Sequence, residues 1–203
     1  MRKPLSAALT LLFASGMQVS LAQDSHTTNT ARPALYPDHL ATQFAGNIGL
    51  LSAGIGYSYA KDRLQTEFLY GVVPAFESKT TLHIITAKTT WYSRSRPINE
   101  RYGWVPVRAG TGISYSVGRQ FFTQLPSQYP NGYYWFSTSF RLTPFVGTAL
   151  NLSLNEGRTA FKKLELYADL GTTDIHLLSY SLNTKALKPW NVFNLAFGLK
   201  AVF

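Results

Sequence analysis

The sequence predicts an all-β fold, an eight-stranded antiparallel up-and-down transmembrane β-barrel. Three observations predict it. Segments of about ten residues alternate between apolar and small or polar side chains, with turn residues between them. The charged residues within these segments share one face with Gly, Ser and Thr. The final segment, from Phe193 to Phe203, keeps the same period of two and stops on an aromatic residue.

The chain of 203 residues suits one domain after an export signal. Residues 1–22 combine a basic start, a short interrupted apolar run and a small-x-small site ending at Ala22, which predicts a cleaved signal peptide. Residues 23–38 are polar, contain two prolines and lack a period, so we expect a disordered periplasmic lead-in. Residues 39–203 are expected to form the barrel.

Turn residues divide the barrel region into eight expected strands. They cover residues 39–45, 48–60, 64–74, 81–92, 105–117, 140–154, 163–171 and 190–203. The first pair leaves an alternative open, because residues 43–59 also read as one long strand, which would spoil the even count. Beyond Gly171 the phase becomes unclear, and we expect a bulge or an extended segment above the membrane through Ser181.

The segment 105–117 has the clearest alternation. Its odd positions, Val105 to Val117, are mostly apolar, and its even positions carry Arg108 among glycines and serines. The odd set, including Val105, is therefore expected to face outward.

The charged residues inside the strands predict what the barrel encloses. A basic side chain facing lipid at the membrane midplane costs about 2–4 kcal/mol, so these residues are expected to face the lumen. An eight-stranded barrel has room only for its own side chains, so four basic and three acidic groups would pair across a packed, poreless interior. The expected lumen residues are Glu67, Lys88, Arg108, Arg141, Glu165, Asp169 and Lys200.

The opposite face predicts the surroundings of the barrel. It holds Tyr, Phe, Leu, Ile and Val on most strands, and a soluble monomer does not tolerate an apolar belt of that size. We expect an interfacial aromatic girdle near the strand ends. Its expected members are Trp91, Tyr92, Trp104, Tyr115, Tyr134, Trp135 and Trp190.

These features favour the outer membrane of a Gram-negative bacterium. The expected partners are outer-membrane lipids, lipopolysaccharide and the barrel-assembly machinery, because the strand ending at Phe203 resembles the C-terminal insertion signal of such barrels. Ala201 departs from that signal, which usually has a bulky residue there. The formal charge is +9, but the basic residues are scattered among strands, so no nucleic-acid partner is expected. With no cysteine and four scattered histidines, neither a metal site nor a cofactor is expected.

The order of strands, turns and one long loop resembles the lipid A deacylase family of small outer-membrane barrels, notably over Val105–Val117 and the last hairpin. That resemblance implies an esterase with a His-x-Ser pair and an acidic partner. This sequence has no His-x-Ser, so those catalytic residues do not carry over. His176 and Ser179 are weak substitutes, because three positions apart in an extended strand they would point to opposite faces.

The long loop between the fifth and sixth expected strands is the other candidate site. Its side chains could bind a lipid, a glycan or a protein, or could simply cover the barrel mouth and anchor in the interface. They are Arg119, Phe121, Phe122, Tyr129, Tyr133, Tyr134 and Trp135. The sequence therefore favours a structural or surface-interaction barrel over two alternatives, a lipid A or phospholipid ester hydrolase and a narrow channel.

Overall fold

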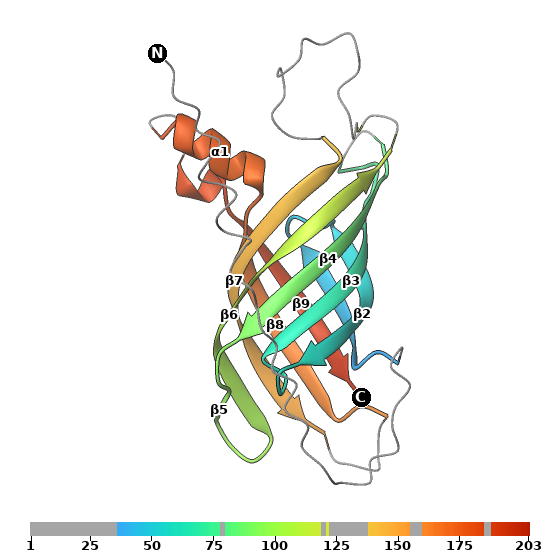
Figure 1. Cartoon of the computed structure of the whole chain (residues 1–203), viewed down its shortest axis with the longest axis vertical. Coiled ribbons are helices and arrows are strands. Elements are labelled where there is room, and N and C mark those ends of the chain that lie inside the picture. The colour runs from blue at the N-terminus through green and yellow to red at the C-terminus, as the bar shows by residue number, and fades with distance from the viewer. Residues whose placement is uncertain (1–35, 78–79, 119–120, 122–137, 155–159, 185–187) are drawn as a thin grey trace. The chain divides into compact units, whose positions relative to one another are not determined.

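Eight long strands close into one antiparallel barrel in the computed structural model of the chain (Figure 1). The structure describes residues 36–77, 80–118, 121, 138–154, 160–184 and 188–203. The expected signal peptide and nearly all of the expected lead-in lie outside the described residues. Residues 37–203 form one compact unit, and only that unit is described below.

The barrel strands follow the expected segments closely. They are β1 (His39–Ala45), β2 (Leu51–Tyr59), β3 (Leu64–Val73), β4 (Leu82–Tyr92), β6 (Tyr102–Val117), β7 (Phe140–Ser153), β8 (Lys163–Gly171) and β9 (Asn194–Val202). β1 and β2 are two strands joined by a turn, so the single long strand is excluded. A short strand, β5 (Arg96–Pro97), extends one edge of β6 beyond the ring.

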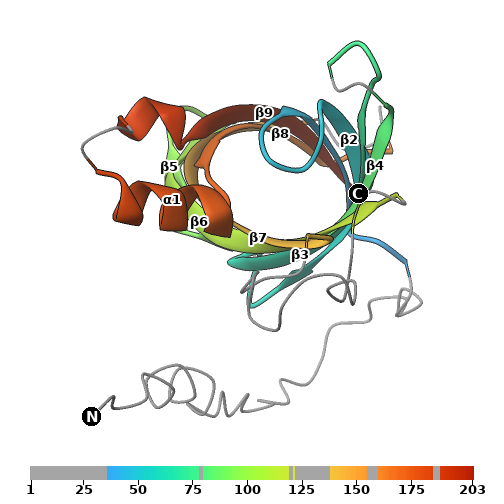
Figure 2. The same ribbon diagram turned by 90° about the horizontal axis from the view of Figure 1, so that it is seen from above.

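One pairing between distant parts of the chain closes the ring. Each of the eight barrel strands pairs with the next barrel strand along the chain, β4 with β6 because β5 lies outside the ring, and β1 pairs with β9. The view along the barrel shows the resulting closed oval (Figure 2). We call the end where β1 begins and β9 finishes the near end, since His39 and Val202 are partners there. The opposite end is the far end.

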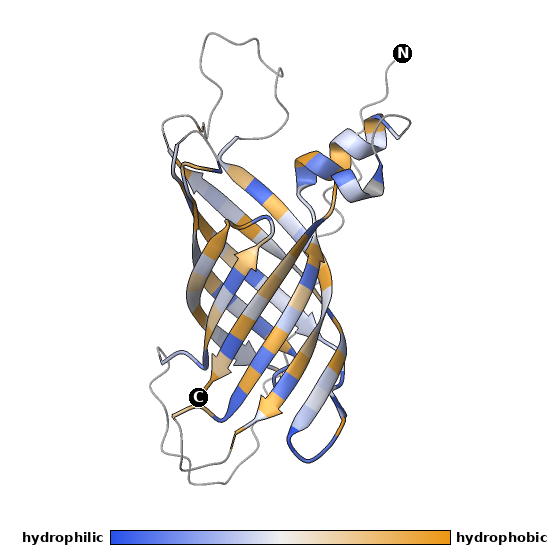
Figure 3. Ribbon diagram, turned by 180° about the vertical axis from the view of Figure 1, so that it is seen from behind, coloured by the Kyte–Doolittle hydropathy of each residue, from blue (hydrophilic) through white to orange (hydrophobic). Residues whose placement is uncertain are grey.

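Strand alternation places the core of this protein inside the ring. In β4, for example, Thr86, Lys88 and Thr90 are buried while Ile85 and Trp91 are about half exposed on the outer surface. The same alternation of apolar and polar bands is visible on the strands that face the viewer in Figure 3. The apolar side chains thus form the outer belt, and the polar and charged side chains form the interior.

A β-bulge in β6 reverses one expected orientation. The pairing of β6 with β7 shifts register between Val105 and Arg108, so Val105 lies inside against Ala149 although it was expected to face outward. Pro106 lies at the shift, where its missing N–H interrupts the ladder least. The bulge keeps both Val105 and Arg108 inward although they are three positions apart.

The segment after β8 is a helix, so the expected bulge or extended segment is wrong. Helix α1 (Asp174–Leu182) begins after Thr173, whose hydroxyl accepts a hydrogen bond from the His176 N–H at 3.3 Å. This is a standard N-cap, and it supports a helix that buries none of its own side chains. A short 3-10 turn, Pro189–Asn191, then leads into β9.

Candidate functional site: the barrel interior

Six Asp, Glu, Lys and Arg side chains lie almost completely buried inside the ring. They are Glu67 on β3, Lys88 on β4, Arg108 on β6, Glu165 and Asp169 on β8, and Lys200 on β9. Three are acidic and three are basic, so the set is electrically balanced when all are ionised. Balance matters here because an unpaired buried charge is strongly destabilising.

Lys200 is the centre of the cluster closer to the near end. Its ammonium group contacts the carboxylate of Glu67 and donates hydrogen bonds to Gln65 at 2.8 Å and Tyr92 at 2.6 Å. The Tyr92 hydroxyl in turn donates to Glu165 at 2.8 Å. Glu165 also lies 3.8 Å from the Lys200 ammonium. One cation therefore joins two carboxylates on opposite parts of the ring.

Asp169 is the centre of the second cluster, further along the axis. One of its oxygens accepts a hydrogen bond from Lys88 at 2.9 Å, and the other lies 3.5 Å from the guanidinium of Arg108. Lys88 also donates to the amide oxygen of Gln43 at 2.9 Å. Gln43 thus links β1 to the charges that β4 and β8 contribute.

Aromatic rings fill the space between the two clusters. The Arg108 guanidinium carbon lies 3.9 Å from the ring centroid of Tyr167 and 5.2 Å from that of Tyr92. The Lys88 ammonium lies 4.2 Å from the ring centroid of Phe145. Cations over aromatic faces gain electrostatic energy while filling space, so these rings seal the middle of the barrel. Between Lys88 and the far end, the interior contains a cavity of about 20 Å³.

His39 lies at the near-end edge of the same network. It is fully buried, and its Nε2 is 3.5 Å from a Glu67 oxygen. The opposite position on β2 is Gly56, where a Cβ would overlap the imidazole ring. A glycine on the neighbouring strand therefore creates the space that this histidine occupies.

The structure places Arg141 apart from these clusters. It lies at the start of β7, near the far end, is only half-buried, and donates a hydrogen bond to the Phe140 carbonyl at 2.7 Å. Of the seven expected lumen residues, six come together and Arg141 does not.

Several members of the network were not singled out from the sequence. Tyr92 was expected in the interfacial girdle, but it faces inward and is 5% exposed. His39 and Gln43 had no assigned role. The signal that could have found all three is strand parity, since each falls on the same face as a buried charged or small residue of its own strand.

The weak catalytic pair does not reach the barrel interior. His176 and Ser179 both lie on α1 rather than on an extended strand, so the expectation that they point to opposite faces is wrong. His176 is exposed, and within the described chain no hydrogen bond joins the two side chains. Among the described residues around them, no hydrogen bond orients the serine toward the histidine.

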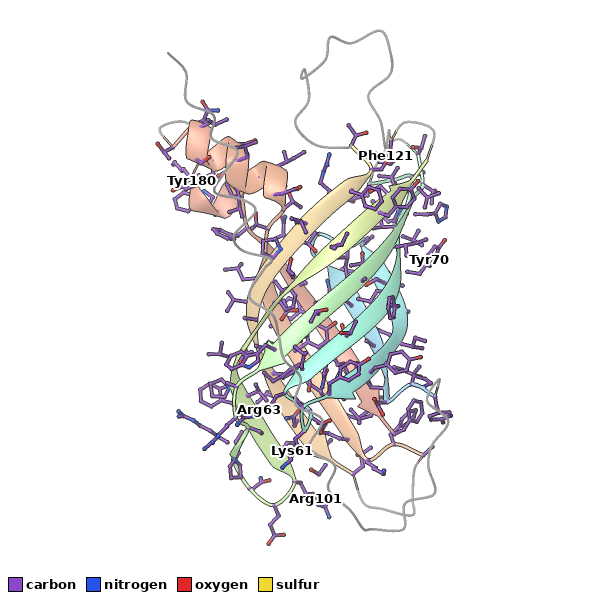
Figure 4. All side chains as sticks on the ribbon, in the orientation of Figure 1. Lys61, Arg63, Tyr70, Arg101, Phe121 and Tyr180 are labelled. Atoms are coloured by element: carbon purple, nitrogen blue, oxygen red, sulfur yellow. The ribbon has the colours of Figure 1, made fainter. Side chains whose placement is uncertain are left out.

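The long-loop candidates are almost entirely outside the described residues. Phe121 is the exception; it is half-buried at the far end, with its N–H bonded to the Gly118 carbonyl at 3.1 Å (Figure 4). Outside the described residues lie Arg119, Phe122, Tyr129, Tyr133, Tyr134 and Trp135. Within the described residues, no group of three or more His, Asp and Glu side chains could hold a metal ion.

Comparison with known proteins gives no match: no protein-family model, no curated protein and no solved structure matches this chain. The resemblance to the lipid A deacylases therefore has no support beyond the layout of its strands. What the structure establishes is a closed, eight-stranded antiparallel β-barrel with a packed, charge-balanced interior.

Proposed function

We propose that this protein is an integral outer-membrane barrel with a structural or surface-interaction role, and that its packed lumen does not serve as a pore. The observation that carries the proposal is the strict separation of side chains by face. On the eight barrel strands as described, six of the eight Asp, Glu, Lys and Arg side chains are buried inside the ring, and the other two, Arg141 and Lys163, are half-buried at strand ends.

The outer face has the composition that hydrocarbon requires. Exposed large apolar side chains come from every barrel strand, for example Phe44, Phe68, Ile113 and Leu166, which are 49% exposed or more. Around a whole barrel this belt is far larger than the apolar patches of soluble monomers. Neither helix in the described part of the chain is both long and apolar enough to cross a membrane.

Aromatic and polar side chains bound this belt at both ends. Tyr59, Trp91 and Trp104 face outward toward the near end. Toward the far end, the Tyr70 hydroxyl hydrogen-bonds to His83 at 2.6 Å on the outer surface. Amphipathic rings of this kind favour the two interfaces of a bilayer, which fits lipids and lipopolysaccharide as the surrounding partners.

Membrane fractionation of a Gram-negative host that produces the full chain tests the proposal. We expect the protein in the outer-membrane fraction, extractable only with detergent and migrating faster on an unheated gel than after boiling. Protein that stays in solution without detergent would contradict the proposal.

A comparison of lipid A separates this role from the esterase alternative. We expect the lipid A mass spectrum to be the same in cells with and without the protein, because no described side chains form a nucleophile and base. Loss of one acyl chain only in producing cells would overturn the non-enzymatic role.

A further inference from the structure

The near end of the barrel holds two adjoining cavities of about 420 and 410 Å³. They share Ser95, Asn151 and Lys163 in their walls, so they form one basin with two lobes, which we call the near-end basin. Sites for small molecules usually measure about 300–1,000 Å³. The basin is therefore large enough for a ligand, in contrast to the cavity of about 20 Å³ on the far side.

Basic side chains from separate elements surround the near-end basin. Lys61 and Arg63 come from the turn between β2 and β3, Arg94 follows β4, and Lys163 begins β8. Arg101 lines the second lobe, and Figure 4 labels it with Lys61 and Arg63 at this end of the barrel. In the part of the chain that the structure describes, none of these five cations has a carboxylate within ion-pair distance.

The three carboxylates that line the near-end basin leave it with a positive excess. Glu165 is already held by Tyr92 and Lys200, and Asp62 and Glu100 are exposed on the turns. Among the described residues that line both lobes, five cations against three carboxylates give a net charge of +2. A concave surface lined mainly by one sign of charge concentrates ligands of the opposite sign.

Neutral polar groups line the deeper part of the near-end basin. Its floor contains Gln65 and Tyr92, and the wall shared by both lobes contains Asn151. The side-chain oxygen of Asn151 is buried and has no hydrogen-bond partner. This oxygen is closed to solvent, so a ligand in the basin would meet the charged side chains rather than this acceptor.

We propose that the near-end basin binds a small, soluble polyanion, one that carries two or more phosphate or carboxylate charges. The cations that line both lobes would hold these charges. The floor residues Gln65 and Glu165 are buried within the ring of strands. A ligand must therefore enter along the axis, which favours a soluble anion over the headgroup of a lipid that surrounds the barrel.

Calorimetric titration of the detergent-solubilised full chain tests this inference. The probes are fructose 1,6-bisphosphate, citrate and, as the uncharged control, fructose. We expect saturable binding of fructose 1,6-bisphosphate, weaker binding of citrate and none of fructose. Failure of every probe to bind at millimolar concentration would overturn the inference.

Matched variants locate the site. Removing one charge with Arg63→Gln is expected to weaken binding by about threefold, and a combined Lys61→Asn, Arg63→Gln, Arg94→Gln and Lys163→Gln variant by at least about tenfold. The control is Arg96→Gln, an equal charge change on β5 outside both lobes, which is expected to leave the affinity unchanged within about twofold. Equal weakening by Arg63→Gln and Arg96→Gln would indicate a general charge effect and contradict the site.

A lipid arm separates the two sources of phosphate. Nanodiscs doped with phosphatidylglycerol are expected to leave the fructose 1,6-bisphosphate titration unchanged, whereas competition by this lipid would overturn the soluble-ligand inference. The membrane role is tested separately, by fractionation. A barrel that enters the outer membrane but binds no probe would therefore contradict the polyanion site and not the membrane role.

Discussion

Asp169 is the residue on which the central charges depend most. It is the carboxylate that pairs with both Lys88 and Arg108, and all three side chains are buried. Asp169→Asn would leave two enclosed cations without a counter-charge at that depth. We expect a loss of about 3–5 kcal/mol in the free energy of unfolding, measured by denaturant titration in a fixed detergent.

Two further variants make that result interpretable. Asp62→Asn makes the same chemical change on an exposed turn and is expected to change stability by less than about 0.5 kcal/mol. Combining Asp169→Asn with Lys88→Met restores the charge balance, so the double variant is expected to lose less than the sum of the single losses. Strict additivity would show that the network does not act as a unit.

Gly198 gives a second prediction at the residue scale. A Cβ at this position of β9 would overlap the Tyr167 ring, which is fixed between β8 and the guanidinium of Arg108. Gly198→Ala is therefore expected to destabilise the barrel by about 1–3 kcal/mol through overpacking, measured by the same denaturant titration.

Gly103 provides the matched control for this substitution. The one close contact of a Cβ there would be the Ser95 hydroxyl at 2.8 Å, the end of a short side chain that can rotate away, and its other neighbours lie at 3.8 Å. Gly103→Ala is expected to cost less than about 0.5 kcal/mol. A Gly198→Ala variant as stable as Gly103→Ala would mean that the Tyr167 ring is not tightly held.

Strands were the elements best predicted from the sequence, because regular alternation indicates which face of the sheet each residue occupies. The bounds of β1 and β8 agree with the expected ranges, and other strand ends differ by a few residues. Alternation fails where the phase slips. At Pro106 the bulge adds one residue to β6 and turns Val105 inward, and the alternation of the neighbouring residues did not predict this one-residue shift.

Helix α1 was missed for a related reason. Its nine residues are too few to establish a helical period, and they follow a strand whose phase simply becomes unclear. Its sequence signal was the start, Thr173 followed by Asp174, which is a good N-cap with an acidic first turn. In the barrel interior, the charged residues could be predicted from the sequence. Their neutral partners were not predicted, because a glutamine or tyrosine on an inward face does not by itself require a partner.

The outward face of the strands gives a prediction at the element scale. Leu166 lies near the middle of β8 and is 56% exposed, so in a bilayer it would face the hydrocarbon centre. Leu166→Arg is expected to lower the free energy of unfolding in lipid vesicles by about 2–4 kcal/mol.

Leu51, the first residue of β2 at the far end, is the control for this depth effect. It is 61% exposed, and Leu51→Arg is expected to cost only about 0–1 kcal/mol because a residue there lies near an interface. Equal costs at the two positions would contradict a bilayer around the strands.

The whole molecule is predicted to be closed to ions. Because Arg108, Tyr167 and Tyr92 seal the middle of the lumen, we expect no steady conductance steps from the wild-type barrel in planar bilayers. The double variant Arg108→Ser with Tyr167→Ser removes the central guanidinium and one ring, and it is expected to conduct. Folding of the variant is checked by the mobility difference between unheated and boiled samples. Steady conductance by the wild type would contradict a sealed lumen.

The pairing of β1 with β9 also has a consequence for how the chain matures. Thr42 bonds to the carbonyl of Leu199, 157 positions away, and Lys200 supplies the cation that joins Glu67 to Glu165. A nascent chain that still lacks this last segment has two unpaired edges and an incomplete set of internal counter-ions. The ring therefore cannot close, nor its internal charges balance, until the last strand of the chain is in place.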